Sequence, residues 1–321
     1  MIERIRDAAR LLDGVALRTP LVDVTGVVPP GGAAPVMLKM ESAQPIGAYK
    51  VRGAYTAIAR LDPAARARGV VTSSSGNHGQ AVAWAARAFG VRAVVVMPGS
   101  APKVKVAGVR SWGGEVVVAG ATRSPEQTAR MEQLGRDEGL AVIPPFDHED
   151  VVAGQGTVGL EILEQWPEVE TILVPVGGGG LIAGISAAVA AVKPSVRVVG
   201  VEPAGAPKLS AALAAGAPVE LPETASVADG LLTRSVGRLT WPILSAVVRE
   251  AVRVEEVEIA RAVALLYRQL RLTVEPSGAV ATAALLAGRV VPTGPTVAVV
   301  SGGNVDPEQL ERLLASDLAA R

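Results

Sequence analysis

Residues 171–185 read TILVPVGGGGLIAGI: an apolar run rich in β-branched residues, then four glycines, then a second apolar segment. This composition predicts a buried strand, a glycine turn and the start of a helix. A similar succession occurs at residues 70–86 (VVTSSSGNHGQAVAWAA), and its strand and turn occur again at residues 297–304 (VAVVSGGN). The chain therefore repeats a unit in which a strand leads through a Gly/Ser-rich turn into a helix.

Four further segments have strand character, at residues 35–39, 91–97, 115–118 and 196–201. Strands that alternate with helical segments predict an α/β protein with doubly wound, mainly parallel sheets. In such sheets ligands bind beyond the carboxyl ends of the strands, where all three Gly/Ser turns lie. Several of these turns could therefore face one cleft.

The composition sets limits on the class of protein. The chain has 321 residues, 49% of them hydrophobic, which predicts a sizeable core and two domains. Lys and Arg total 31, and so do Asp and Glu, so no net charge favours binding to nucleic acid. There is no cysteine, which excludes disulfides and thiolate chemistry.

Nothing in the sequence predicts attachment to a membrane. Residues 1–14 lack the apolar core and the cleavage site of a secretory signal. The longest apolar stretches, residues 94–98 and 181–192, are shorter than the ~20 residues that a membrane helix needs. We therefore expect a cytoplasmic protein.

The four consecutive glycines, residues 177–180, predict a phosphate site. Glycine lets the backbone approach a ligand closely, and the following helix start offers N–H donors and partial positive charge to an anion. No Lys-Ser/Thr pair follows, so this is no Walker loop, and the spacing differs from the dinucleotide fingerprint. The alternative is a flexible loop, but the entropic cost of four glycines between strand and helix argues against it.

Residues 41–55, ESAQPIGAYKVRGAY, place Lys50 after a Pro/Gly turn, where a helix could begin. A lysine near a helix N-terminus and a cationic neighbour tends to lose its proton, as an amine that forms an imine must. Taken alone, most lysines in such a place are solvated surface residues. The residues around Lys50 change that interpretation.

This segment resembles the cofactor-lysine motif of the serine/threonine dehydratase family of fold type II pyridoxal-phosphate enzymes. Five other segments resemble later motifs of the family in the same order, at residues 74–80, 175–181, 228–230, 275–279 and 301–304. The resemblance runs from about residue 18 to Asp306. It implies two doubly wound α/β domains, similar to the β subunit of tryptophan synthase, and pyridoxal 5'-phosphate as cofactor.

The resemblance also implies roles for individual residues. Lys50 would carry the cofactor as an imine and act as the base at the substrate Cα–H, and Tyr49 would lie beside the ring. Asn77 would hydrogen-bond the ring hydroxyl, Ser301 would face the pyridine nitrogen, and Gly230 would pass close to the ring edge. The phosphate would be held by the backbone N–H groups of Gly177, Gly178, Gly179, Gly180 and Leu181.

The substrate carboxylate would be bound in a pocket lined by Ser74, Asn77 and His78. Ser75 would lie on the ring face opposite Lys50. His78 has a second interpretation, in which it only orients the Ser/Asn turn. The other histidine, His148, lies among carboxylates, and we expect a solvated acidic loop there because adjacent residues rarely converge on one ion.

The implied reaction is loss of water and then ammonia from L-threonine or L-serine, which leaves a 2-oxo acid. A serine at the pyridine nitrogen is neutral and leaves the ring a weaker electron sink than an aspartate would. That favours prompt departure of the β-hydroxyl over transamination. The bound phosphate is a plausible acid for the departing hydroxyl.

Three alternatives remain open. The first is an amino-acid racemase such as a serine racemase, because the Ser75 hydroxyl could return a proton to the other face. The second is a dehydratase of 3-hydroxyaspartate or phenylserine, for which Arg52 or Arg234 would be candidate cations for an acidic side chain. The third is a non-catalytic phosphate-binding module, against which Lys50, Asn77 and Ser301 together argue.

Some racemase-type relatives bind a divalent metal near the position of Glu202, with a carboxylate six residues further on. This chain has Lys208 there, so we predict a Glu202–Lys208 ion pair and no divalent metal. By resemblance we expect a large domain from residues 1–52 and 145–321, a small domain from residues 53–144, and a homodimer. The chain ends soon after residues 301–304, which predicts no appended regulatory domain.

Overall fold

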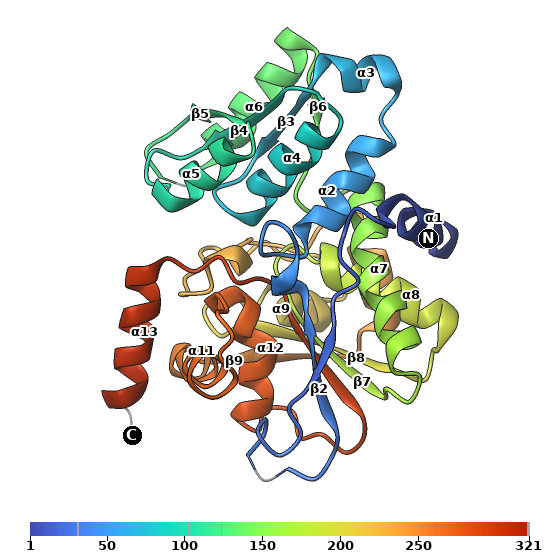
Figure 1. Cartoon of the computed structure of the whole chain (residues 1–321), viewed down its shortest axis with the longest axis vertical. Helices are drawn as coiled ribbons and strands as arrows, with labels where there is room; N and C mark the ends of the chain where they lie inside the picture. The colour runs from blue at the N-terminus through green and yellow to red at the C-terminus, as the bar shows by residue number, and fades with distance from the viewer. Residues whose placement is uncertain (31, 102, 123, 320–321) are drawn as a thin grey trace.

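The computed structural model describes residues 1–30, 32–101, 103–122 and 124–319, and it contains two β-sheets (Figure 1). Strands alternate with helices along most of the chain. All strand pairs in both sheets are parallel except the β1–β2 pair. The expectation of an α/β protein with mainly parallel sheets is therefore confirmed.

The larger sheet has six strands, and their spatial order differs from their order in the chain. In space they follow one another as β1 (Leu21–Asp23), β2 (Val36–Met40), β10 (Thr296–Val300), β7 (Thr171–Pro175), β8 (Arg197–Pro203) and β9 (Glu250–Val254). The smaller sheet has four strands in the order β5 (Glu115–Val118), β4 (Ala93–Met97), β3 (Val70–Ser73) and β6 (Ala141–Val142).

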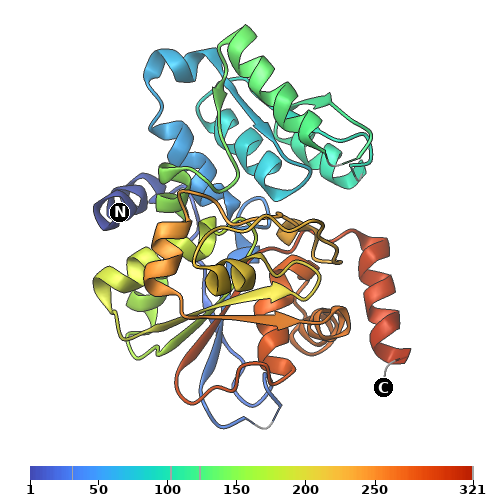
Figure 2. The same ribbon diagram turned by 180° about the vertical axis from the view of Figure 1, so that it is seen from behind.

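Helices cover both faces of each sheet (Figures 1 and 2). They are α1 (Ile2–Leu12), α2 (Lys50–Ala59), α3 (Pro63–Arg68), α4 (Asn77–Ala88), α5 (Lys103–Ser111), α6 (Pro125–Glu138), α7 (Glu149–Gln165), α8 (Gly180–Val192), α9 (Lys208–Ala215), α10 (Trp241–Val247), α11 (Glu256–Leu270), α12 (Pro276–Leu286) and α13 (Pro307–Ala319). Two short 3₁₀ helices, η1 (Glu41–Ala43) and η2 (Asp229–Leu231), complete the described elements. No helix of the described residues is long and apolar enough to cross a membrane.

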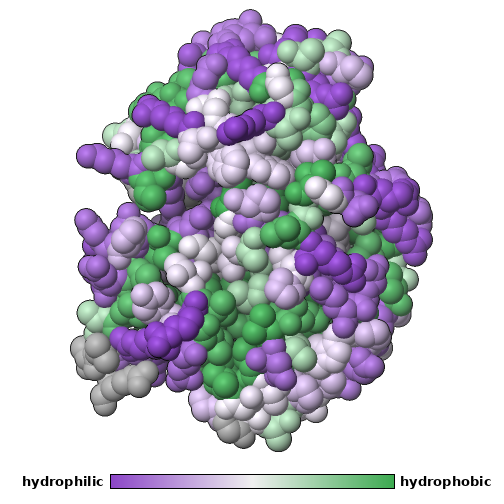
Figure 3. Space-filling model, in the orientation of Figure 1, coloured by the Kyte–Doolittle hydropathy of each residue, from purple (hydrophilic) through white to green (hydrophobic). Residues whose placement is uncertain are grey.

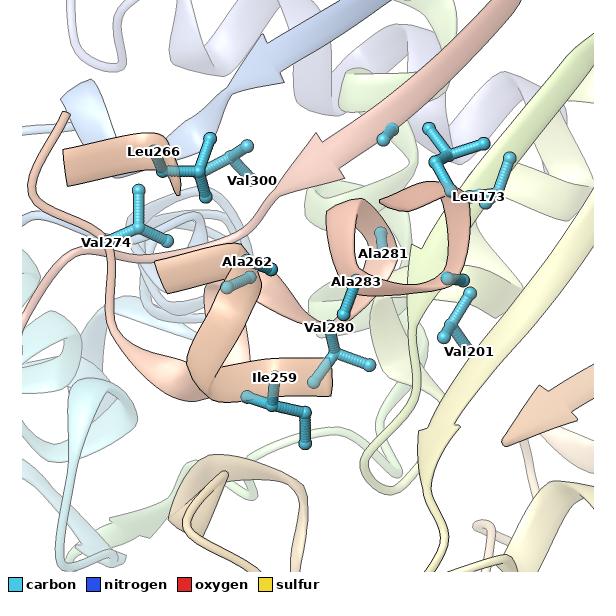
Figure 4. Close-up of a cluster of buried hydrophobic side chains, with 14 of the residues drawn as sticks. Leu173, Val201, Ile259, Ala262, Leu266, Val274, Val280, Ala281, Ala283 and Val300 are labelled. Atoms are coloured by element: carbon cyan, nitrogen blue, oxygen red, sulfur yellow. The ribbon is translucent and has the colours of Figure 1, made fainter. Parts of the chain in front are cut away.

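The strands of the larger sheet are apolar on both faces because both faces are packed. On β7, Leu173 joins a core with Val280 and Ile259 of helices α12 and α11 (Figure 4). Its neighbours Ile172 and Val174 point the other way and join a core built largely with α7 and α8. Successive side chains of a strand alternate between faces, so a strand buried on both sides has a continuous apolar sequence.

The smaller sheet follows the same rule. Val70 of β3 packs into a core with α2, α4 and α5, and Val71 packs on the opposite face with Met131 and Leu134 of α6. Helix α2 belongs to the smaller sheet's core and also packs against α7, which covers the larger sheet. It therefore lies between the two sheets, as Figure 1 shows.

Candidate active site

A cavity of about 850 Å³ lies between the parts of the molecule that contain the two sheets. The space-filling view shows the surface hollowed between these two parts (Figure 3). The residues to which the resemblance assigned a cofactor or substrate contact all line this cavity: Tyr49, Lys50, Ser74, Ser75, Asn77, His78, Gly177, Gly178, Gly179, Gly180, Leu181, Gly230 and Ser301. The expectation that the Gly/Ser turns meet in one cleft is therefore confirmed.

The glycine turn joins β7 to α8 and fits an anionic group. Gly179 has φ +94°, a left-handed conformation that favours glycine, and Gly180 begins the 13-residue helix α8. A Cβ at Gly178 would lie 2.4 Å from the Phe146 ring, so a side chain there would force the turn or the ring to shift. The first N–H groups of α8 have no intrahelical acceptor and carry the positive end of the helix dipole. This combination suits a phosphate group.

Lys50 is the first residue of α2 and lines the cavity. The ammonium group donates to the Pro145 carbonyl at 2.8 Å and lies 5.1 Å from the centre of the Tyr49 ring. The ion pairs of the described residues do not include it. Burial lowers the pKa of Lys50 to about 8, because the charged amine loses its water without gaining a carboxylate. An amine with this pKa is ready to attack an aldehyde near neutral pH.

Ser301 and the lysine segment are joined by backbone contacts. The Tyr49 N–H donates to the Ser301 carbonyl at 3.1 Å, and Ala48 forms an isolated antiparallel bridge with Gly302. Ser301 follows β10, and its residue is 4% exposed. The neutral hydroxyl side chain therefore lies close in the fold to Lys50, in the wall of the same cavity.

The turn after β3 brings the other polar residues to the cavity. Asn77 starts α4, and its side chain donates to Glu275 and accepts from Asn304. Ser74 and Ser75 precede it, and the Ser74 hydroxyl oxygen accepts from the Gly76 N–H at 3.2 Å. These residues could present hydroxyl and N–H donors to a carboxylate at the amino end of a 12-residue helix.

His78 is buried in this turn. Its Nε2 atom lies 2.9 Å from the Ile143 carbonyl oxygen, which makes Nε2 the protonated nitrogen. Burial, together with the nearby charge of Lys50, lowers the pKa of His78 to about 3, so the ring is neutral. Within the described residues the buried Nδ1 atom has no hydrogen-bond partner. This geometry favours the interpretation in which His78 orients the turn.

Comparisons with known proteins agree with this site. A family model described as "Pyridoxal-phosphate dependent enzyme" matches residues 12–302. The chain belongs to this family. Pyridoxal phosphate is accordingly the cofactor of this enzyme, and the site described above fits it, with a buried amine, a glycine turn for the phosphate and a neutral serine within one cavity.

The pyridoxal-phosphate enzyme is similar to proteins of two activities. Over 287 residues it is 44% identical to an L-threonine ammonia-lyase of Geobacter sulfurreducens, covering 89% of this chain and 71% of that protein. Over 312 residues it is 38% identical to a serine racemase of Oryza sativa subsp. indica, covering 95% of this chain and 91% of that protein.

A solved structure of maize serine racemase superposes with a TM-score of 0.92 at 36% identity, covering 99% of this chain and 98% of that one. The resemblance to the serine/threonine dehydratase family and the fold type II architecture are thereby confirmed. The pyridoxal-phosphate enzyme therefore has a known fold and cofactor, and close relatives with two different reactions.

Sequence reasoning missed several residues of the site in this pyridoxal-phosphate enzyme. Glu275 lines the cavity, and burial, followed by the nearby charge of Asp229, raises its pKa to about 7. Lys105 of α5 also lines the cavity and forms an ion pair with Asp229. Glu275 lay in a recognised motif but had no role assigned to it, whereas no local pattern distinguished Lys105 from other lysines.

One of the two arginines considered for acidic substrates is in the wrong place. Arg52 is 1% exposed, and its guanidinium is bonded to the carboxylates of Glu41 and Glu161, so that expectation is wrong. Arg234 does line the cavity, where it pairs with Glu220 at 3.2 Å. Arg52 instead fixes the start of α2 to the larger part of the molecule.

The predicted Glu202–Lys208 ion pair is confirmed in the pyridoxal-phosphate enzyme. The two charged atoms are 3.5 Å apart, and both side chains are fully buried. Lys208 also donates to the Ala206 carbonyl, while Glu202 accepts from the N–H groups of Leu209 and Ser210 and from the Ser210 hydroxyl. Among the described residues, no cluster of three or more His, Cys, Asp or Glu side chains could hold a metal ion.

Proposed function

We propose that the chain is a dehydratase that converts L-threonine, L-serine or both into a 2-oxo acid and ammonia by β-elimination. The observation that carries this proposal is the environment of Lys50. Its amine has a carbonyl partner and no ion-pair partner among the described residues, and it shares a cavity with the glycine turn and the neutral Ser301. A base that gives up its proton near neutral pH is what removal of a Cα proton requires.

Bound pyridoxal phosphate supplies an aldehyde that condenses with amines and a ring that withdraws electrons from the substrate Cα. The chain would hold it with the N–H groups from Gly177 to Leu181 at the phosphate, with Asn77 at the ring hydroxyl and with Ser301 at the pyridine nitrogen. Tyr49 would lie beside the ring and Gly230 at its edge. Lys50 would move the proton at the substrate Cα.

Ser74, Ser75 and Asn77 would form the site for the substrate carboxylate, and His78 would line the same pocket and orient their turn. Support comes from their position at the amino end of α4, where the helix dipole favours an anion. A neutral Ser301 would hold no proton at the pyridine nitrogen, and the cofactor would then be a weaker electron sink. That would favour prompt departure of the β-hydroxyl over other outcomes.

Racemisation of serine is the second candidate, and one observation favours it. Ser75 lines the same cavity as Lys50, so a hydroxyl is available as a second proton donor. The same cavity would serve both reactions, because they share the removal of the Cα proton. We rank racemisation second or as a side reaction, and dehydration of 3-hydroxyaspartate or phenylserine third.

A substrate panel tests the proposal. The purified enzyme is incubated with L- and D-threonine, serine, 3-hydroxyaspartate and phenylserine, and both oxo-acid release and formation of the opposite enantiomer are measured. We expect 2-oxobutyrate or pyruvate from the L-substrates, faster than any D-serine. Faster appearance of D-serine than of pyruvate would overturn the ranking.

Variants test the role of the lysine. Lys50→Ala should abolish both reactions, and Lys103→Ala, at an exposed position on α5, should leave them unchanged. Substantial turnover by Lys50→Ala would contradict the proposed role of Lys50 as the base.

We also propose the division into a large domain, residues 1–52 and 145–321, and a small domain, residues 53–144. It is supported by the two separate sheets and by the four apolar clusters that cover their faces. A cytoplasmic homodimer completes the proposal, and light scattering of the purified protein would test the dimer.

A further inference from the structure

Three amide and carboxylate side chains from separate segments form a hydrogen-bonded chain beside the cavity. Asn304 Nδ2 donates to Asn77 Oδ1 at 2.8 Å, and Asn77 Nδ2 donates to Glu275 Oε1 at 2.6 Å. Asn77 begins α4, which packs with the smaller sheet, and Glu275 immediately precedes α12, which packs with the larger one. The chain of hydrogen bonds therefore crosses between the two parts of the molecule at the cofactor site.

These contacts fix the orientation of the Asn77 amide. An asparagine amide has one carbonyl oxygen and two N–H groups. Here the oxygen accepts from Asn304, and one N–H donates to Glu275. Rotating the amide by half a turn would set its NH₂ against the Asn304 NH₂, which is repulsive, and would set its oxygen against Glu275, which is repulsive when that acid is ionised. One N–H of Asn77 therefore remains for a ligand in a fixed orientation.

Asn304 is itself fixed. Its Nδ2 atom also donates to the Ile46 carbonyl at 2.7 Å, so both of its N–H groups are used. Ile46 lies four residues before Lys50 in the chain. The same amide thus ties the segment that carries the reactive lysine to the side chain of Asn77.

Two glycines make room for this network. A Cβ at Gly302 would lie 2.3 Å from Glu275 Oε1, and a Cβ at Gly47 would lie 2.6 Å from Asn304 Oδ1. The Glu275 carboxylate also stands at the amino end of the 11-residue helix α12, whose dipole favours an acceptor there. Backbone and side chains together preserve the arrangement.

We propose that Glu275 and Asn304 are positioning residues, which hold the Asn77 amide as a preoriented N–H donor for the ring hydroxyl of pyridoxal phosphate. The inference rests on the proposed contact of Asn77 with the cofactor. A donor that is already oriented loses little freedom when the cofactor binds, and it therefore strengthens binding. It also favours the deprotonated form of the ring oxygen.

A double-mutant cycle on cofactor affinity tests this inference. The dissociation constant of pyridoxal phosphate is measured by absorbance titration of the cofactor-free wild type, Glu275→Met, Asn77→Ala and the double variant. We expect Glu275→Met to raise the constant about five- to tenfold in the wild type and less than about twofold in the Asn77→Ala background. An increase of equal size in both backgrounds would show that Glu275 acts independently of Asn77 and would overturn the inference.

Conservative variants supply a second readout. Glu275→Gln keeps an acceptor for Asn77 and should keep the wild-type affinity, whereas Asn304→Asp places an acceptor against the Asn77 oxygen and should weaken it. The visible absorbance band of the bound cofactor should titrate at higher pH in Glu275→Met and Asn304→Asp, and at wild-type pH in Glu275→Gln. Equal titration midpoints in all four proteins would contradict the positioning role.

Neither measurement requires turnover. An enzyme that binds the cofactor but releases no oxo acid would overturn the proposed dehydration. The coupling between Glu275 and Asn77 would still be measured in that enzyme, so the two failures are distinguishable.

Discussion

Lys105 of α5 forms an ion pair with Asp229 of η2, so a side chain on a helix of the smaller sheet is bonded across the cavity to a residue beside the larger sheet. The side chains are 12% and 44% exposed, which makes this a partly screened contact. Both residues line the cavity. The pair therefore connects α5 to the larger part of the molecule at the wall of the cavity.

Removing the Lys105 charge should weaken substrate binding more than catalysis. We expect Lys105→Met to raise KM about two- to fivefold, with a smaller change in kcat, because a contact of this exposure contributes ~0.2–1 kcal/mol. Initial rates against substrate concentration measure both constants. Lys103→Met, at an exposed position on the same helix, is the control. An equal effect of both substitutions would show that the pair with Asp229 has no particular role.

The lowered pKa of Lys50 predicts its pH-dependent reactivity. Burial lowers that pKa to about 8, and only the unprotonated amine is a nucleophile. In the cofactor-free enzyme, brief acylation at a series of pH values should therefore modify Lys50 with a midpoint near pH 8. In the same protein unfolded in urea, Lys50 should react with a midpoint near the ordinary pKa of lysine, about 10.4. Mass spectrometry of the peptides gives the two curves, and coincident midpoints would refute the prediction.

The glycine turn should tolerate no side chain at position 178. In Gly178→Ala the added methyl would meet the Phe146 ring at 2.4 Å, so the turn or the ring has to shift. We expect the affinity for pyridoxal phosphate to fall at least about tenfold, because the displaced N–H groups no longer converge on the phosphate. The double variant Gly178→Ala/Phe146→Ala should regain part of the affinity. If the second substitution gives no recovery, contact with Phe146 is not the cause.

The buried Glu202–Lys208 pair should matter for stability. Lys208→Met leaves the Glu202 carboxylate buried without its cation, and we expect the free energy of unfolding to fall by about 3 kcal/mol. Urea unfolding of the cofactor-free protein measures it. Adding Glu202→Gln should restore part of the loss, since the uncompensated charge is then gone.

The same pair predicts a pH dependence. Burial lowers the pKa of Lys208 to about 8, below its unfolded value of about 10.4, so the unfolded chain binds more protons between these values. The contribution of Lys208 to stability therefore rises with pH over this range. The free energy of unfolding of wild type minus that of Lys208→Met should increase from pH 8 to pH 10. A constant difference would contradict the lowered pKa.

Strands buried on both faces were predictable from the sequence, and so was the edge strand β5, whereas the short or edge strands β1, β6 and β9 were not. The apolar runs of β7 and β10 reveal strands because each successive side chain meets a packed helix layer. Strand β6 has only two residues, Ala141–Val142, which is too short for any periodicity. Strand β9 lies at the sheet edge, and Glu250 and Arg253 interrupt its apolar pattern.

The site divides in the same way. Residues in Gly/Ser turns at strand ends were found because their local sequence already shows a ligand-binding turn. Lys105 and Glu275 reach the cavity through long-range packing, 124 and 198 residues away in the chain from Asp229 and Asn77 respectively. No local pattern distinguishes Lys105, and the motif at residues 275–279 does not say which side chain Glu275 meets, so only the fold reveals these contacts.

Arg52, two residues after Lys50, is bonded to Glu41 and Glu161 inside the larger part of the molecule. The first turn of α2 is therefore fixed to the larger part of the molecule. If the smaller sheet rotates during the catalytic cycle, the hinge lies after the first turn of α2. Ser74 and Ser75 would then move toward Lys50, which keeps its position. Opening and closing would then change access to the cavity while the Lys50 backbone keeps its position.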